Sequence, residues 1–235
     1  MAKSVSFEEN DAVAVVRIDD GKANALGPDL MQAIGAALDE AEEKRLAVLL
    51  LGRQGRFSAG FDLGVMTTGG PAAGRDMVEM GGRLSLRLGR FPAPVVIGCG
   101  GHALAMGAVL LLSADLRIGV DGAFKIGFNE VSIGMTTPLF LLEQARERMS
   151  KRHFVRATAQ SQIYHPASAV DAGFLDRVVD AEQLETTALV EAQRLAALPR
   201  KAFFTTRSRA RGAILDEIEA GLKDDVAGLM STAAS

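Results

Sequence analysis

The chain has 235 residues, of which 48% are hydrophobic and 23% charged, and this composition is that of a globular protein rather than a disordered one. Its length fits one domain, or one domain with a small appendage. A formal net charge of −3 argues against binding to a nucleic-acid backbone, and the lack of tryptophan with a single tyrosine argues against platforms for stacking bases or sugars.

Cysteine content and hydropathy predict a cytoplasmic protein. Cys99 is the only cysteine, so we expect a buried thiol rather than a disulfide framework or a thiolate metal site. Residues Met1–Ser4 contain no apolar signal core. The longest apolar stretch, Ala103–Leu112, is far too short to span a membrane. We therefore expect no membrane contact and no nucleic-acid partner.

Strands and helices are predicted in turn along the first half of the chain. Apolar runs predict strands at Ser4–Glu8, Ala12–Ile18, Leu46–Leu51, Val95–Cys99 and Leu116–Val120. A helix should begin at Pro28, a favourable first helical position. Its apolar face carries Leu30, Ile34, Leu38 and Ala41. Further helices are predicted at Arg75–Leu88 and Ala108–Ala114, with a mobile loop at Met66–Gly74.

The last third of the chain is predicted to be mainly helical. The predicted helices are Pro138–Met149, Lys151–Ala159, Pro166–Ala172, Ala181–Leu198 and Lys201–Leu229. A short strand, Leu175–Val179, lies among them. This order of elements predicts an α/β or α+β chain whose helical tail packs on itself or on a partner.

Glycine is concentrated in the middle of the chain, where 18 of the 25 glycines lie between Gly52 and Gly134. Such a concentration indicates a backbone that bends sharply or approaches another group closely. Two turns in this stretch, Phe57–Leu63 and Gly101–Gly107, each follow a buried strand and lead into a helix. Free backbone N–H groups at two helix starts that face one point would form an oxyanion hole. The alternative is two ordinary strand-to-helix turns.

A dinucleotide site is a second interpretation of this region. Residues Val95–Ala103 match the pattern G-x-G-x-x-A after a strand, and an acid follows at Asp115 or Asp121. That fingerprint should open a long helix directly, but Gly107 interrupts the helix after a few residues. Strand–helix alternation is also poor on both sides, which argues against a dinucleotide site, and spacing alone favours two ordinary strand-to-helix turns.

Several motifs, in their order and spacing, resemble the crotonase (enoyl-CoA hydratase/isomerase) superfamily. They are Asn24–Leu26, Phe57–Leu63, Gly101–Gly107, Asp115–Arg117, Asn129–Met135 and Pro166–Asp176. The resemblance implies an α/β fold with a ββα spiral core over residues 1–180 and a helical trimerisation region over residues 181–235. It also implies acyl-CoA thioester substrates, and homotrimers that often pair into hexamers. Coenzyme A is then part of the substrate, and no separate cofactor and no metal is expected.

The resemblance also implies roles for individual residues. The backbone N–H groups of Phe61 and Met106 would hold the thioester oxygen, and Met106, where glycine is common, should narrow the acyl pocket. The loop from Lys22 to Leu26, with Ala59, matches segments that hold the adenine and pantetheine of CoA. The implied substrate-binding and CoA-binding residues are Lys22, Ala23, Ala25, Ala59, Gly60, Asp62, Gly107 and Val109.

The predicted chemistry depends on a single carboxylate. Stabilising the enolate oxygen makes removal of the thioester α-proton possible, and a carboxylate beside the α-carbon then acts as base. Hydratases of the family use two glutamates that hold a water; one position is Val109 here, and the other aligns with Glu130. A single carboxylate can still carry a proton from one carbon to another, which is the pattern of the family's Δ3,Δ2-enoyl-CoA isomerases.

We therefore expect isomerisation with Glu130 as base. One alternative is a hydratase or another crotonase reaction in which Glu130 alone or a different residue handles the water. The other alternative, from a different class, is a catalytically silent scaffold that binds acyl-CoA. An ordinary loop glutamate remains the plain interpretation of Glu130. The segments Met66–Gly74 and Thr136–Phe140 are expected to shape the acyl pocket.

Several other polar residues are expected to be structural. Asp62 should cap a helix or fix its turn, and Asp115 and Arg117 should support the fold. His102 should support the second turn. His153 and His165 are expected at the surface. A cationic run is expected to form a solvated helix face, or alternatively to meet CoA phosphates from a neighbouring subunit. It comprises Arg146, Arg148, Lys151 and Arg152.

Overall fold

The computed structural model describes the backbone of residues 4–232 and the side chains of residues 4–228. Within these residues, one large sheet has the strand order β1-β2-β4-β7-β9-β11. Its strands are β1 (Val5–Asn10), β2 (Val13–Ile18), β4 (Ala47–Leu51), β7 (Val95–Cys99), β9 (Leu116–Val120) and β11 (Arg177–Val179). β1 and β2 pair antiparallel, and the other neighbours pair parallel. β4 and β7 are buried along their whole length because the sheet is covered on both faces, which explains their continuous apolar runs.

Short strands continue from the strands of the large sheet. They are β3 (Ala25–Leu26), β5 (Gly55–Ser58), β6 (Gly60–Phe61), β8 (Gly101–Leu104) and β10 (Ile126–Gly127). β5, β8 and β10 follow β4, β7 and β9 along the chain and form their own parallel sheet in the order β10-β8-β5, while β3 pairs with β6. The strand–strand–helix repeat implied by the sequence is therefore present, and each repeat ends in a turn beside the next.

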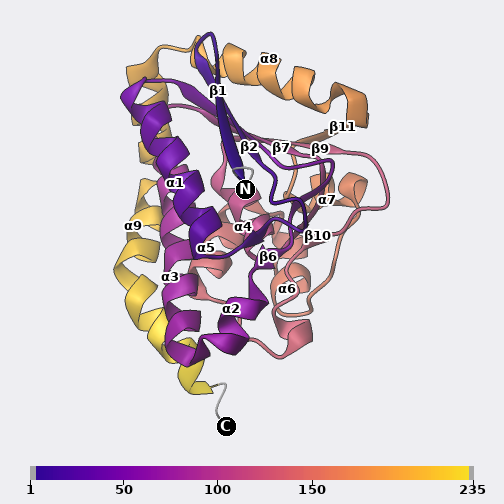
Figure 1. Ribbon diagram of the computed structural model, residues 1–235, viewed down its shortest axis with the longest axis vertical. Helices are drawn as coiled ribbons and strands as arrows, with labels where there is room; N and C mark the ends of the chain where they lie inside the picture. The colour runs from indigo at the N-terminus through magenta and orange to yellow at the C-terminus, as the bar shows by residue number, and fades with distance from the viewer. Residues whose placement is uncertain (1–3, 233–235) are drawn as a thin grey trace.

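Helices cover both faces of the large sheet. They are α1 (Pro28–Glu43), α2 (Leu63–Thr68), α3 (Gly70–Gly89), α4 (Met106–Ser113), α5 (Leu139–Arg148), α6 (Lys151–Thr158), α7 (Pro166–Ala172), α8 (Leu184–Ala196) and α9 (Arg200–Thr232), with 3-10 turns η1 (Val131–Ile133) and η2 (Ala181–Gln183). α8 packs Leu184, Ala188 and Ala192 on one face of the sheet. α1, α3 and α4 pack on the other face, and Figure 1 shows α8 apart from them.

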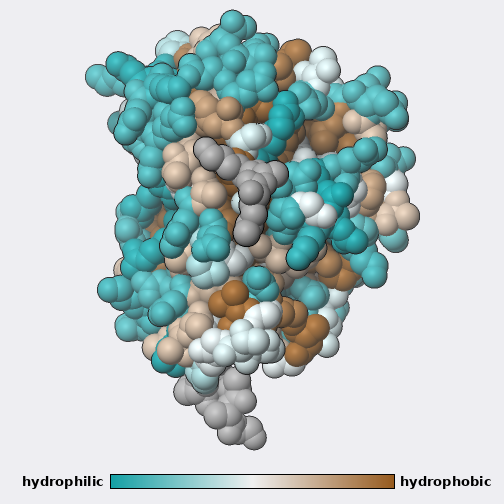
Figure 2. All heavy atoms as spheres, in the orientation of Figure 1, coloured by the Kyte–Doolittle hydropathy of each residue, from teal (hydrophilic) through white to brown (hydrophobic). Residues whose placement is uncertain are grey.

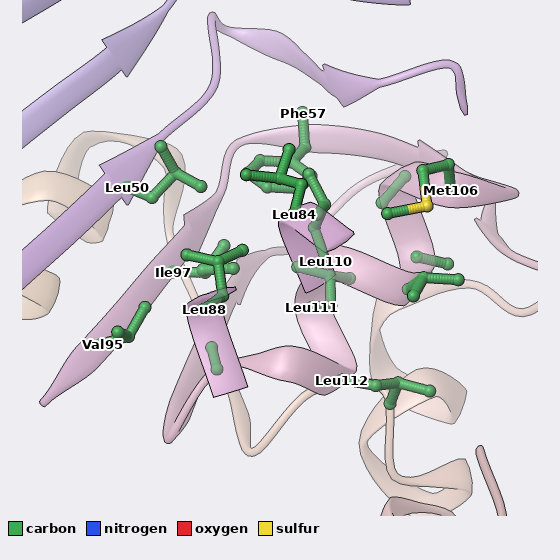
Figure 3. Packing of buried hydrophobic residues seen from close by; sticks show 14 of the residues in the cluster. Leu50, Phe57, Leu84, Leu88, Val95, Ile97, Met106, Leu110, Leu111 and Leu112 are labelled. Carbon is green, nitrogen blue, oxygen red and sulfur yellow. The ribbon is translucent and has the colours of Figure 1, made fainter. Parts of the chain in front are cut away.

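α4 forms the centre of the larger core. Every residue of this helix is buried, which explains why its sequence is apolar on all sides up to its last residue, Ser113. Figure 3 shows Leu110, Leu111 and Leu112 among side chains from β4, β7 and α3. At its C-terminal end, Arg211 of α9 donates hydrogen bonds of 3.2 Å to the carbonyls of Leu112 and Ser113. These bonds satisfy carbonyls that have no partner within the helix.

α9 lies along α3 and α5 (Figure 1). Leu215 and Leu222 pack where Gly89 and Gly82 leave no side chain on α3. The Asp225 carboxylate accepts a 2.7 Å hydrogen bond from the first N–H of α5. Across residues 4–232, none of the helices is both long and apolar enough to cross a membrane.

The predicted elements agree with the structure except in the glycine-rich middle. The predicted strands and helices are present, with boundaries shifted by a few residues. The mobile loop predicted over residues 66–74 is wrong, because α2 extends to Thr68 and α3 begins at Gly70. Asp62 caps α2 by accepting a 2.9 Å hydrogen bond from the Gly64 N–H, and Pro71 occupies the first turn of α3.

Two predictions of surface side chains are also wrong. His153 is only 8% exposed, because its ring contacts Tyr164 and Asp171. Arg148 is half-buried rather than part of a solvated face, since its guanidinium turns inward and donates a 3.0 Å hydrogen bond to the carbonyl of Ala114. Burial, followed by the charges of Arg117 and Arg211, lowers the pKa of Arg148 to about 10.

Three structural expectations are confirmed. Cys99 is a buried thiol, and desolvation raises its pKa to about 12. The Asp115 carboxylate accepts hydrogen bonds from the Val95 N–H at 2.9 Å and from buried Arg207 at 2.8 Å. Arg117 pairs with Asp176, which ties β9 to the start of β11.

Candidate active site

The structure brings the two predicted turns together. Gly60, in the first turn, has a φ of +93°, and a Cβ built there would lie 2.7 Å from the Cβ of Ala105 and 3.4 Å from the Met106 nitrogen. Any side chain at this position would therefore press against the second turn. Glycine is required here both for its backbone conformation and for this close approach.

The second turn has a strained backbone at the start of α4. Ala105 adopts φ +49° and ψ −124°, a conformation that residues with a side chain rarely adopt. Its N–H donates a 3.0 Å hydrogen bond to the carbonyl of Gly127, and its carbonyl accepts from the N–H groups of Ala108 and Val109. Met106 is thus the first residue of α4, where backbone N–H groups have no partner within the helix.

The side chains of Phe61 and Met106 meet at one point on α3. A Cβ on Gly81 would lie 2.5 Å from the Phe61 ring and 3.2 Å from the Met106 sulfur. Figure 3 shows Met106 in the same apolar cluster as Phe57 and Leu84. The two residues predicted to supply N–H donors are therefore fixed against the same helix.

Gly107 brings the start of α4 against β5. A Cβ at Gly107 would lie 2.8 Å from the Ser58 carbonyl oxygen, a backbone atom that cannot move aside cheaply. Val109, two residues further along α4, is fully buried. α4 contains no ionisable side chain, so this helix supplies no carboxyl group to the site.

The loop predicted to hold CoA lies beside the first turn. β3 pairs with β6, with Ala25 opposite Gly60, and the Ala59 N–H donates a 3.0 Å hydrogen bond to the carbonyl of Ala23. Lys22 and Ala59 are exposed, while Ala23 and Ala25 are half-buried. These residues therefore form a partly accessible edge next to Phe61.

Asn24 fixes this loop, a positioning role that the sequence reasoning missed. It is fully buried with φ +49°, and its amide donates to the carbonyls of Ile18 at 2.9 Å and Phe57 at 3.1 Å. The Ser58 hydroxyl donates in turn to the Asn24 carbonyl at 2.8 Å. An asparagine in a loop that follows a strand can indicate a position with a left-handed backbone, because asparagine tolerates that conformation.

His102 supports the second turn from the surface side. Its Nδ1 accepts a 2.9 Å hydrogen bond from the Lys125 N–H, and its ring meets Phe124 edge to face at 5.3 Å. Desolvation, then Arg56 and Lys125, lower the pKa of His102. The ring therefore stays neutral at neutral pH and bonds to the segment that leads into β10.

Glu130 is a buried carboxylate between β10 and η1. Glu130 is only 7% exposed, and its Oε2 has no hydrogen-bond partner among the described residues. Burial raises the pKa of Glu130 to about 7, against the opposing effect of hydrogen bonds from backbone N–H groups of Glu130 and Asn129. A carboxyl group with this pKa can both take up and release a proton near neutral pH.

Backbone contacts link Glu130 to the second turn. The carbonyl of Gly127, three residues before Glu130, accepts the hydrogen bond from Ala105. Over residues 4–232, no group of three His, Cys, Asp or Glu side chains is placed to hold a metal ion. The chemistry available here is that of N–H donors from two turns and one buried carboxyl group.

Comparisons with known proteins agree with this arrangement. The family model for enoyl-CoA hydratase/isomerase matches residues 8–235. A solved enoyl-CoA hydratase/isomerase family protein from Pseudomonas syringae superposes with a TM-score of 0.94 at 41% identity, covering 97% of this chain and 99% of that one. The chain therefore belongs to the enoyl-CoA hydratase/isomerase family, the crotonase superfamily, and has its fold.

Curated relatives carry both activities of the family. Human mitochondrial enoyl-CoA delta isomerase 1 is 29% identical over 223 residues, which cover 93% of this chain and 74% of the human protein. A short-chain-enoyl-CoA hydratase from Clostridium acetobutylicum is 30% identical over 190 residues, covering 79% of this chain and 72% of that protein. The chain is accordingly an enoyl-CoA enzyme of the crotonase type.

Proposed function

We propose that the protein catalyses Δ3,Δ2-enoyl-CoA isomerisation with Glu130 as its only acid–base group. The observation that carries the proposal is the contrast between two positions. Glu130 is buried, without an ion pair among the described residues, and has a pKa of about 7. Val109, where a hydratase of the family has its second glutamate, is apolar and fully buried. One carboxyl group suffices for moving a proton and leaves no partner to hold a water.

The reaction would proceed through an enolate. The N–H groups of Phe61 and Met106 would donate hydrogen bonds to the thioester oxygen and stabilise the negative charge that develops on it. The Glu130 carboxylate would remove a proton from C2 of a 3-enoyl-CoA, and the electrons would move onto the thioester oxygen. The protonated carboxyl group would return that proton to C4, which leaves the double bond between C2 and C3. Water is neither consumed nor released.

The human isomerase relative supports this proposal, and the hydratase relative supports the alternative. In the hydratase alternative, Glu130 alone or a different residue would activate the water. A third possibility is a scaffold that binds acyl-CoA without turnover. The composition of α4 favours the isomerase, because the helix carries no carboxyl group and the hydroxyl of Ser113, its one polar side chain, already bonds to the Val109 carbonyl and to Gln144.

Substrate binding and assembly are part of the same proposal. Lys22, Ala23, Ala25 and Ala59 would hold the adenine and pantetheine portions of CoA along the edge formed by β3 and β6. We further propose a homotrimer, or a hexamer made of two trimers, in the cytoplasm. Exposed apolar side chains favour self-association: Leu63 of α2, and Val131 and Ile133 of η1, are 54%, 44% and 50% exposed. Apolar residues reach the surface around α2 in Figure 2.

The test offers 3-enoyl-CoA and 2-enoyl-CoA separately to the purified protein. We expect isomerisation of the first, no hydration of the second, and loss of isomerisation in Glu130→Gln. Val109→Ala is a matched control, because it also alters a buried site residue but removes no carboxyl group. Robust hydration of 2-enoyl-CoA by the unmodified protein would refute the isomerase proposal. Binding of both thioesters without turnover would favour the scaffold.

A further inference from the structure

β10 joins the two parts of the candidate site. On one side, its residue Gly127 accepts the hydrogen bond from Ala105, directly before Met106. β10 ends at Gly127, and the chain then runs through Phe128 to Glu130. A shift of β10 would therefore move the proposed base and the second proposed N–H donor relative to the bound thioester.

The opposite edge of β10 is held by residues 162–164. Ile126 and Tyr164 exchange two backbone hydrogen bonds of 2.9 Å each. A Cβ on Gly127, whose φ is +147°, would lie 3.2 Å from the Gln162 carbonyl oxygen and 3.3 Å from a side-chain atom of Ile163. This segment therefore packs directly on β10, and its position determines that of β10.

Tyr164 is itself held by a chain of polar side chains that runs from the core to exposed Asp171. Its hydroxyl lies 3.1 Å from Nδ1 of His153, and Nε2 of His153 lies 3.1 Å from the Asp171 carboxylate. Because a carboxylate only accepts, Nε2 carries a proton, and in a neutral ring Nδ1 accepts from the tyrosine hydroxyl. Arg152 pairs with Asp171 on the solvent side. Tyr164 and His153 are only 2% and 8% exposed, so neither polar group has water as a ready substitute partner.

Ring contacts give a second connection from Tyr164 to the site. The Tyr164 ring lies 5.7 Å from that of Phe174. Phe174 in turn meets Phe128 edge to face at 5.0 Å, and Phe128 is two residues before Glu130. All three rings are buried. The tyrosine therefore reaches the Glu130 segment through both its backbone and its ring.

We propose that His153, Asp171 and Tyr164 form a positioning triad that holds β10, and thereby sets the places of Glu130 and of the Met106 N–H. None of the three contacts the reacting atoms. The inference rests on the proposed roles of Glu130 and Met106. It adds that α6 and α7, which lie outside the two turns, determine how well the base is placed.

The test removes single polar groups from the triad. Tyr164→Phe deletes only the hydroxyl, His153→Phe removes both ring nitrogens, and His153→Gln keeps an amide that can donate to Asp171 and accept from Tyr164. Thr158→Val is the matched control, because it deletes another buried hydroxyl bond on α6, from Thr158 to the Phe154 carbonyl, and Thr158 has no hydrogen bond to the described part of residues 162–164. Each variant is measured for kcat and KM with 3-enoyl-CoA and for thermal unfolding.

A readout independent of turnover is the pKa of the Glu130 carboxyl group, followed by carbon-13 NMR and assigned with Glu130→Gln. We expect Tyr164→Phe and His153→Phe to lower kcat at least about tenfold with little change in KM, because small misplacements of reacting groups cost rate. The Glu130 pKa should fall toward its ordinary value of 4.5 as water reaches the loosened segment. His153→Gln should recover most of the rate, and Thr158→Val should leave both readouts unchanged.

Two results would overturn the positioning role. One is a Tyr164→Phe protein with kcat and Glu130 pKa equal to those of the unmodified chain. The other is a loss of rate that Thr158→Val reproduces at an equal loss of thermal stability, since that would be a general effect of weakening α6. If the unmodified protein shows no isomerisation, the proposed function fails, and the Glu130 pKa in the variants still tests the triad.

Discussion

Replacing Glu130 by glutamine is predicted to stabilise the fold above neutral pH. In the folded chain, burial raises the pKa of Glu130 from its ordinary 4.5 to about 7. Below about pH 4.5 the carboxyl group is protonated in both the folded and the unfolded chain. As the pH rises from there to 7, the unfolded chain ionises first, and the free energy of unfolding falls by about 1.4 kcal/mol per pH unit. Above 7 the loss is constant at about 3 kcal/mol.

Urea unfolding of both proteins between pH 5 and pH 8 measures this effect. The difference in the free energy of unfolding between Glu130→Gln and the unmodified protein at low pH is the reference. Relative to it, the variant should be more stable by less than about 1 kcal/mol at pH 5 and by about 3 kcal/mol at pH 8. Exposed Glu182→Gln is the control, because an exposed carboxylate keeps its hydration on folding. If the stability difference between the two proteins does not change with pH, ionising Glu130 in its desolvated site does not lower the free energy of unfolding, and the reasoning is refuted.

Three further substitutions test how the site is built. Gly60→Ala places a Cβ on a backbone with φ +93° and within 2.7 Å of Ala105, so turnover of 3-enoyl-CoA should fall at least about tenfold. Unchanged turnover would mean that the two turns need not meet. Gly81→Ala places a methyl group 2.5 Å from the Phe61 ring, so the acyl chain length with the highest kcat/KM should become shorter. An unchanged preference would show that α3 does not line the acyl pocket. Arg211→Met leaves Glu147 without its 2.9 Å partner and should cost about 3 kcal/mol in urea unfolding, whereas a neutral result would show that α4 does not need this anchor.

The strands and the first helix could be predicted because their signals are local. Continuous apolar runs identify β4 and β7, since strands covered on both faces need them, and Pro28 identifies the start of α1. The two turns were also predictable, because each combines the end of a strand, glycines and the start of a helix. Their approach to each other required the resemblance, since nothing in either sequence segment places Gly60 beside Ala105.

The misses have two causes. The glycines and the proline of residues 66–74 indicate a loop by propensity, but Asp62 caps α2 and Pro71 stands in the first turn of α3. The other two misses depend on contacts made far along the chain. His153 is buried because Tyr164 and Asp171 surround it, and Arg148 turns inward to the Ala114 carbonyl. The sequence around each residue carries no sign of these partners.

The central claim is that one carboxyl group carries the proton from C2 to C4. The most direct test supplies 3-enoyl-CoA deuterated at C2 and measures deuterium at C4 of the product by NMR during the first turnovers. Because Glu130 is only 7% exposed, its proton should exchange slowly with solvent. We therefore predict that a substantial part of the label reaches C4, and that Glu130→Gln forms no product. A product that carries no deuterium at C4 from the earliest times would contradict transfer by a single buried base.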